Sequence, residues 1–311
     1  MTGRHAVLVN LHSRNVRRDP AFLPALREMF QNRGPFLALQ NPTELSSAFS
    51  EIRKRRTDLL FVCGGDGTLR QTVSELIRAY GNTPAPKIAI LKTGTMNTVA
   101  AGLGIRSSAL SQFRWILERC DRALPLPSQL LRPLAINDSH GFIFAVGGFA
   151  NFIARYTEAA DPSPYRAFWM LTRTTVSALF GTSYSRTLFA PFVADIWKDQ
   201  KPLQGRTPLT TISASAIRHI GFGFKPYAQA EGPTEEFGTL ILQASPRSLV
   251  PHLRKIRRGL PIHGSSFEQS SAHEMRIELD RELSPMVDGD LLPPRKEFTL
   301  RSGPALDFVT G

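Results

Sequence analysis

The chain has 311 residues, of which 42% are hydrophobic and 21% charged, and its formal net charge is +12. The length allows two domains, because single hydrophobic cores rarely grow beyond about 250–300 residues. The composition excludes a largely disordered chain, and no apolar segment reaches the roughly 20 residues that span a membrane. The positive charge favours nucleotides, nucleic acids or acidic membrane surfaces as partners, although background composition alone also produces basic proteins.

The number and spacing of the cysteines indicate the cellular compartment in which the protein is expected. Only Cys63 and Cys120 are present, without CxxC spacing, which is typical of buried thiols in a reducing environment. The apolar run at residues 6–9 is too short for the core of a signal peptide. We therefore expect a cytoplasmic protein, attached at most to the inner face of the membrane.

The first third of the chain alternates strand and helix patterns. Short apolar runs predict strands at residues 6–9, 36–39, 59–63 and 87–91. Apolar residues at helical spacing predict helices at 22–30, 43–52 with Thr43 as its N-cap, 69–80, 99–103 and 108–120. This alternation is typical of a parallel sheet covered by helices on both faces.

The pattern changes near residues 125–127, where two prolines flank a leucine. Beyond this point, strand patterns occur at residues 134–137, 142–146, 187–196, 209–216, 239–244, 275–279 and 298–300. Helical patterns occur at residues 165–180 and 248–260. The second part of the chain is therefore expected to be a mostly antiparallel β domain with helical insertions.

A first glycine loop, residues 64–68, lies between a predicted buried strand and a helix. It consists of Gly64, Gly65, Asp66, Gly67 and Thr68. Glycines let backbone N–H groups approach phosphate oxygens, and the following helix offers its positive end. The aspartate suits a Mg²⁺ ion that bridges phosphates, or a hydrogen bond from a hydroxyl group. The alternative is a tight strand-to-helix turn without a ligand.

A second glycine loop, residues 92–98, follows the next strand and contains Gly94, Thr95 and Asn97. Loops after two strands of one parallel sheet can meet at the same edge and add further donors. Neither loop has the GxxxxGK[ST] or GxGxxG spacing, and the chain lacks the HRD and DFG elements of protein kinases.

An acidic turn, Asp288-Gly289-Asp290, lies near the end of the chain. By itself the Asp-Gly pair indicates only a β-hairpin turn.

Together these segments resemble the diacylglycerol-kinase catalytic family, which includes bacterial lipid kinases, sphingosine kinases and ceramide kinases. Residues 64–69 match its GGDGT-L signature, and residues 91–105 are similar to its second loop. Residues 146–149 and 214–226 resemble its glycine-rich segments, and the acidic turn stands where the family carries D-G-E. The resemblance implies a nucleotide-binding α/β domain of the NAD-kinase/diacylglycerol-kinase type at residues 1–127. It also implies a β-sandwich lipid domain at 128–301, and a last strand within 302–311 that returns to the first domain.

The resemblance implies roles for individual residues, with ATP and Mg²⁺ as cofactors. Asp66 would hold the metal, and Asp288 would take the proton from the acceptor hydroxyl. Asp290 would orient the site or contact the metal. The implied nucleotide-binding residues are Asn10, Ser13, Gly64, Gly65, Asp66, Gly67, Thr68, Gly94, Thr95 and Asn97. This division of labour suits phosphoryl transfer, which depends on positioning, charge neutralisation and an oriented nucleophile.

The expected function is an ATP-dependent lipid kinase that phosphorylates a hydroxyl of a diacylglycerol- or sphingoid-like lipid. A kinase of the same superfamily acting on NAD or a sugar phosphate, and a non-catalytic nucleotide- or lipid-binding protein, are the alternatives. The basic run at residues 254–258 suits an anionic membrane surface, or a solvated helix face. We expect the lipid substrate and this surface as partners and no nucleic acid, and the sequence leaves a homodimer open.

Overall fold

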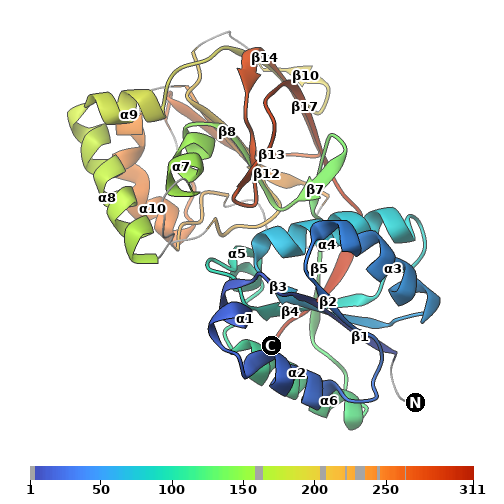
Figure 1. Cartoon of the computed structure of the whole chain (residues 1–311). Coiled ribbons are helices and arrows are strands. Elements are labelled where there is room, and N and C mark those ends of the chain that lie inside the picture. Colours follow the sequence, from blue (N-terminus) through green and yellow to red (C-terminus); the bar gives the residue numbers. More distant parts are fainter. Residues whose placement is uncertain are drawn as a thin grey trace. The chain divides into compact units, whose positions relative to one another are not determined.

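The computed structural model describes residues 4–157, 164–203, 208–220, 223–227, 235–243, 246–262 and 264–311. Parts of two predicted segments, residues 221–222 and 244, lie outside these ranges. The chain divides into two compact units, Met1–Leu131 with Pro304–Gly311, and Arg132–Gly303 (Figure 1). The first is an α/β unit with a mostly parallel sheet and the second is built from antiparallel sheets, which confirms the predicted fold class.

The first unit is organised around a six-stranded sheet with the order β2-β1-β3-β4-β18-β5. Its strands are β1 (His5–Asn10), β2 (Phe36–Leu39), β3 (Leu59–Gly64), β4 (Lys87–Lys92), β5 (Ser128–Leu131) and β18 (Leu306–Val309). All neighbouring strands are parallel except β5, which pairs antiparallel with β18. The last strand of the chain is thus part of the first unit. Every residue of β3 is buried, as expected for a central parallel strand covered on both faces.

Helices cover both faces of this sheet. They are α1 (Arg14–Arg18), α2 (Phe22–Phe30), η1 (Pro42–Glu44), α3 (Leu45–Lys54), α4 (Asp66–Tyr80), α5 (Thr98–Gly102) and α6 (Ala109–Asp121). Figure 1 shows α2 and α6 on one face and α3 with α4 on the other. The rings of Phe61 on β3 and Phe113 on α6 meet edge to face at 4.7 Å, and Phe30 on α2 packs beside both.

The second unit is a β-sandwich of two six-stranded antiparallel sheets. One sheet contains β10 (Lys201–Pro202), β9 (Ala194–Lys198), β14 (Glu274–Leu283), β17 (Arg295–Ser302), β6 (Leu134–Ile136) and β7 (Ser139–Gly141). The other contains β13 (Phe267–Ala272), β12 (Phe237–Leu242), β11 (Thr211–Ser215), β8 (Ile143–Gly147), β15 (Met286–Val287) and β16 (Asp290–Leu291). Buried apolar side chains of both sheets form one core, in which Phe144 of β8 meets Phe298 of β17 with ring centroids 5.3 Å apart.

Helical segments flank the second sheet. They are α7 (Gly148–Thr157), α8 (Pro164–Phe180), α9 (Ser183–Leu188), η2 (Pro246–His252) and α10 (Leu253–Arg258). Helix α7 follows β8 directly and packs against β11, β15 and β16, whereas α8 packs against α9 and η2. Among the residues that the structure describes, no helix combines the length and apolarity needed to cross a bilayer.

Three local predictions are wrong. Thr43 does not cap a helix, because Asn41 and Glu44 form a reciprocal capping box around η1, with Pro42 at its first position. The predicted strand at 187–196 is split between the end of α9 and the start of β9. The predicted helix at 248–260 is part 3₁₀ and part α-helix, since Pro251 lacks the N–H of a regular turn.

Candidate active site

The loops that follow β1, β3 and β4 are joined by polar side chains at the carboxyl end of the first sheet. Asn10 Nδ2 donates a hydrogen bond to Thr68 Oγ1 at 2.7 Å, which ties β1 to the first glycine loop. The Thr93 hydroxyl donates to Ser13 Oγ at 3.0 Å, and Ser13 Oγ donates to the Asn10 carbonyl at 2.9 Å. Asn10 and Ser13 therefore hold the neighbouring loops in place, a role that the sequence motif did not indicate.

The two glycine loops touch at Gly65 and Gly94. A Cβ atom added at Gly94 would lie 2.4 Å from Gly65 Cα, and one added at Gly65 would lie 3.1 Å from Gly94 Cα. Beside this contact, Thr93 N donates to the Gly64 carbonyl at 3.1 Å. Glycine is required at this contact because any side chain would drive the loops apart.

Asp66 links the first glycine loop to the helix that follows the second. Its two carboxylate oxygens accept hydrogen bonds from Thr98 N at 3.0 Å and Val99 N at 3.3 Å, the first amides of α5. Burial raises the pKa of Asp66, and the backbone hydrogen bonds oppose this effect. Asp66 therefore positions the second loop.

The metal-binding role of Asp66 stays a prediction. Both of its carboxylate oxygens are turned to backbone amides. Within the described ranges, no three His, Cys, Asp or Glu side chains cluster closely enough to hold a metal ion. An Mg²⁺ ion at this edge would need phosphate oxygens and water for most of its ligands, as is usual in phosphoryl-transfer sites.

Free backbone donors at the start of α4 fit a phosphate group better. The first helical hydrogen bond runs from Leu69 N to the Gly65 carbonyl at 3.0 Å. The amides of Asp66, Gly67 and Thr68 precede it and have no intrahelical partner, since this is true of the first amides of any α-helix. They lie in the loop with the helix dipole behind them, which is the usual arrangement for binding a phosphate.

Asn97 shapes the second glycine loop. Its Oδ1 accepts from Gly94 N at 3.1 Å, and its Nδ2 donates to the Gly94 carbonyl at 2.9 Å. Its φ of +49° is left-handed, a conformation that asparagine adopts more readily than most residues. Thr95 is partly exposed between the two. Asn97 thus closes the loop on itself with both ends of its side-chain amide.

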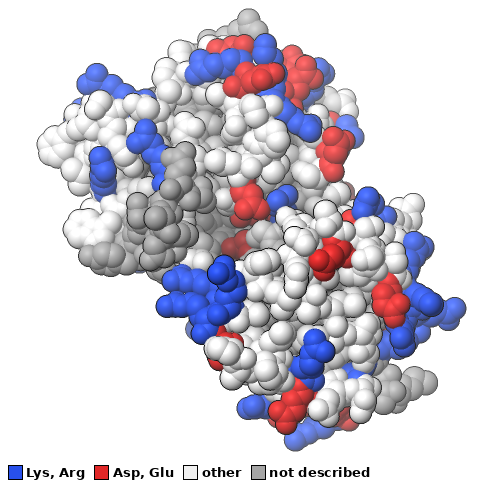
Figure 2. All heavy atoms as spheres, viewed as in Figure 1, with Lys and Arg blue, Asp and Glu red and all other residues white. Residues whose placement is uncertain are grey.

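A cavity of about 750 Å³ opens beside the second glycine loop. Its lining includes Asn97, one carboxylate, Asp19, and three cationic side chains, Arg18, Lys92 and Arg106. Lys92 Nζ donates to the Ile105 carbonyl at 2.9 Å, and burial lowers the pKa of Lys92. Figure 2 shows basic side chains gathered over the part of this unit where α1 and α5 lie. Arg18 and Arg106 belong to none of the motifs found in the sequence.

In the second unit, the acidic turn forms a tight hairpin between β15 and β16. Asp288 and Gly289 have φ values of +51° and +93°, as a two-residue turn of this kind requires. The hairpin expected from the Asp-Gly pair is confirmed. Asp290 is exposed at the start of β16.

The Asp288 carboxylate is held by the backbone that enters β8. Oδ1 accepts from Phe142 N at 2.9 Å and Ile143 N at 2.8 Å, and Oδ2 accepts from Phe142 N at 3.0 Å. A Cβ atom added at Gly141 would lie 2.9 Å from Oδ2, so this glycine permits the approach. Backbone donors of this kind stabilise the ionised carboxylate and fix its direction.

Comparison with known proteins identifies the class of the first unit. Residues 4–126 match the family model of the diacylglycerol kinase catalytic domain. The resemblance predicted from the glycine loops is thereby confirmed over these residues, which include both loops. A comparison with curated proteins finds no match.

Solved structures extend the likeness of fold to the second unit. A crystal structure described as a diacylglycerol kinase from Bacillus anthracis strain Sterne is 14% identical, with a TM-score of 0.69. The match covers 99% of this chain and 97% of that one. Two further structures from that organism, with the same identity and coverage, give TM-scores of 0.72 and 0.70. At this identity the likeness shows a shared fold across both units.

Proposed function

We propose that this protein transfers the γ-phosphate of ATP to a hydroxyl group of a diacylglycerol- or sphingoid-like lipid. The observation that carries the proposal is the pair of glycine loops, which meet at Gly65 and Gly94 within a diacylglycerol kinase catalytic domain. The antiparallel unit shares its fold with structures described as diacylglycerol kinases, which supports a lipid acceptor over NAD or a sugar phosphate.

On the nucleotide side, the backbone amides of the first glycine loop would bind phosphate oxygens. Asp66 and Asn97 would keep the second loop in register with the first, through the hydrogen bonds described above. The cations Arg18, Lys92 and Arg106 give the neighbouring cavity the charge to hold a polyanion. Fixed donors of this kind stabilise the charge that is spread over a phosphoryl group during transfer.

On the acceptor side, Asp288 would accept the proton of the lipid hydroxyl as its oxygen attacks the phosphorus. The two backbone amides fix the direction of the carboxylate, and a general base must be positioned in this way. The tight turn fixes the carboxylate further, because Asp288 and Gly289 leave the hairpin little freedom. Asp290 is exposed and would serve at most to orient the acceptor.

The test is transfer of label from γ-labelled ATP to a panel of diacylglycerol, sphingoid base, ceramide, NAD and a sugar phosphate. We expect label in one of the lipids, and Asp288→Asn should lower the rate by about 10²–10⁴-fold, the usual contribution of a general base. The matched control is Glu282→Gln, which alters an exposed carboxylate of β14 to which no role is assigned. Transfer to NAD alone would reject the lipid acceptor, and a normal rate in Asp288→Asn would reject the base.

A further inference from the structure

We propose that the helical face formed by α7, α8 and α9 docks on an anionic membrane, and that a cavity in this face binds the phosphate of a phospholipid headgroup. The inference deepens the proposed function, on which it rests, by naming the surface through which the second unit would meet its lipid. Membrane binding is measurable without ATP, so its failure can be told apart from a failure of catalysis.

Helix α8 presents an apolar stripe to solvent. Trp169, Val176 and Phe180 are 54%, 47% and 79% exposed, and Arg173 lies among them. These four positions follow the spacing i, i+4, i+7 and i+11, so they share one side of the helix. Leu179, beside Phe180, is 42% exposed. A contiguous group of large exposed apolar side chains marks an interaction surface.

The opposite side of α8 fixes the rotation of the helix. Thr174, Ser177 and Ala178 are buried there. Ser185 of α9 donates its hydroxyl to the Ser177 carbonyl at 3.0 Å, and Ser185 N donates to Ser177 Oγ at 2.9 Å. The small and hydroxyl side chains of α8 therefore face the protein interior, and the large apolar side chains Trp169, Val176 and Phe180 face solvent.

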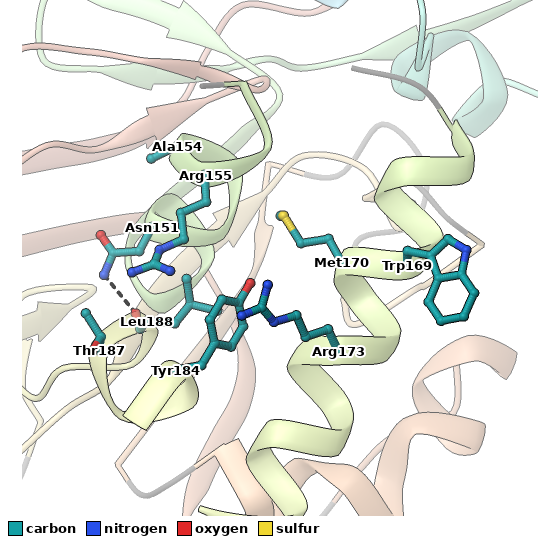
Figure 3. A pocket seen from close by; sticks show the side chains of 9 residues that line it. All are labelled: Asn151, Ala154, Arg155, Trp169, Met170, Arg173, Tyr184, Thr187 and Leu188. Carbon is teal, nitrogen blue, oxygen red and sulfur yellow. Dashed lines mark hydrogen bonds between the residues drawn. The ribbon is translucent and has the colours of Figure 1, made fainter. Parts of the chain in front are cut away.

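A cavity of about 760 Å³ lies between α7, α8 and α9, next to this stripe (Figure 3). Two of its lining residues, Arg155 of α7 and Arg173 of α8, place their guanidinium groups over the ring of Tyr184, at 5.1 and 4.4 Å from its centre. Asn151 donates to the Leu188 carbonyl at 2.8 Å and joins α7 to α9. Arg155 and Arg173 are both held beside the Tyr184 ring, and their like charges repel each other. An anion bound by both guanidinium groups would reduce this repulsion, so the cavity favours an anionic ligand.

The chemistry around the stripe favours a lipid phosphate over other anions. None of α7, α8, α9, η2 and α10 contains Asp or Glu. Exposed Asp290 lies on β16, against which α7 packs, and Glu158 and Asp161 lie outside the described ranges. Helix α10 is anchored by buried Ile256 and exposes four cations, Arg254, Lys255, Arg257 and Arg258. Since α8 packs on η2, which leads into α10, the apolar stripe and the basic helix belong to one unit. Exposed apolar side chains on a unit that also exposes a basic helix are typical of peripheral binding to anionic membranes.

The experiment is sedimentation of the full chain with vesicles of phosphatidylcholine, with and without phosphatidylglycerol, in the absence of ATP. We expect binding only with phosphatidylglycerol, weakening with salt. The double variant Arg155→Gln/Arg173→Gln should bind about 30-fold more weakly, since each cation near the surface contributes about fivefold. Arg276→Gln is the matched control, because Arg276 also lies over an aromatic ring, that of Trp197, at 5.2 Å.

A second measurement tests the apolar stripe. Brominated lipids should quench Trp169 fluorescence, and Phe180→Ser should weaken binding at every salt concentration. Absence of binding to phosphatidylglycerol vesicles would overturn the proposal. Equal binding by the double variant would overturn the cavity's role.

Discussion

Gly94→Ala is the substitution that most directly tests whether the two glycine loops work as one site. The new Cβ atom would lie 2.4 Å from Gly65 Cα, more than 1 Å short of the roughly 3.5–4.0 Å at which carbon atoms pack. Since the obstacle is backbone, no side chain can turn away, and the loops must separate by about 1 Å. The Thr93 N–Gly64 O and Thr98 N–Asp66 Oδ2 hydrogen bonds, 3.1 and 3.0 Å long, join the same loops and would lengthen with them.

The expected cost has two parts. Crowding of this kind typically lowers the free energy of unfolding by about 1–3 kcal/mol. A misplacement of about 1 Å in a site that works by positioning can reduce the rate by about 10²-fold. We therefore expect Gly94→Ala to unfold at lower urea concentration and to bind ATP far more weakly, as measured by chemical denaturation and by calorimetric titration.

Two other glycines provide the controls. Gly65→Ala meets Gly94 Cα at 3.1 Å, a milder clash, and should show the same defects to a smaller degree. Gly104→Ala has open space around the new Cβ but a φ of +76°, so it should lose stability, by about 1–2 kcal/mol, without losing nucleotide affinity. The reasoning would be refuted if Gly94→Ala bound ATP as well as the unmodified protein, or if Gly104→Ala lost affinity equally.

Three further predictions concern buried groups. Asp66→Ala should lower the free energy of unfolding by about 1–3 kcal/mol, because the amides of Thr98 and Val99 lose their hydrogen-bond acceptor. Hydrogen exchange at these two amides should accelerate, and unchanged protection from exchange would contradict this prediction. Cys63 should resist alkylation in the native protein at mildly alkaline pH, because burial raises its pKa to about 12, and rapid labelling by iodoacetamide would contradict its placement. Burial lowers the pKa of His5, His140 and His219. These histidines therefore become protonated near pH 6.5 in the unfolded chain, but only at lower pH in the folded protein. The free energy of unfolding should therefore fall as the pH drops through 6.5 and level off once the lowered pKa values are passed. Urea unfolding at each pH measures this decline, which should be smaller in His5→Leu, and an equal decline in that variant would contradict the reasoning.

The parallel sheet of the first unit could be predicted because its strands are unbroken apolar runs between amphipathic helices. The apolar runs that predicted strands at 59–63 and 87–91 became β3 and β4 almost unchanged. Helix α7 was not predicted, because Gly147 and Gly148 were interpreted as parts of a glycine-rich strand. In the structure Gly147 has a φ of +81° and ends β8, and Gly148 begins the helix.

The site could be predicted only in part. The glycine loops are local motifs, and their meeting follows from the parallel order of β3 and β4. The partners of Asp66 and Asp288 are distant in sequence, since the former binds amides 32 and 33 residues away and the latter amides 145 and 146 residues away. Such contacts depend on strand register and on Gly141, which no local pattern indicates. For the same reason, Arg155, Arg173 and Tyr184 lie on three separate helices and form no local motif.

The most direct test of the proposed activity is the fate of the label when the protein is incubated with diacylglycerol vesicles and ATP labelled at either the α- or the γ-phosphate. A lipid kinase should yield labelled lipid in the organic extract from γ-labelled ATP and none from α-labelled ATP. Extracts without label in both cases, repeated with sphingoid and ceramide vesicles, would contradict the assignment.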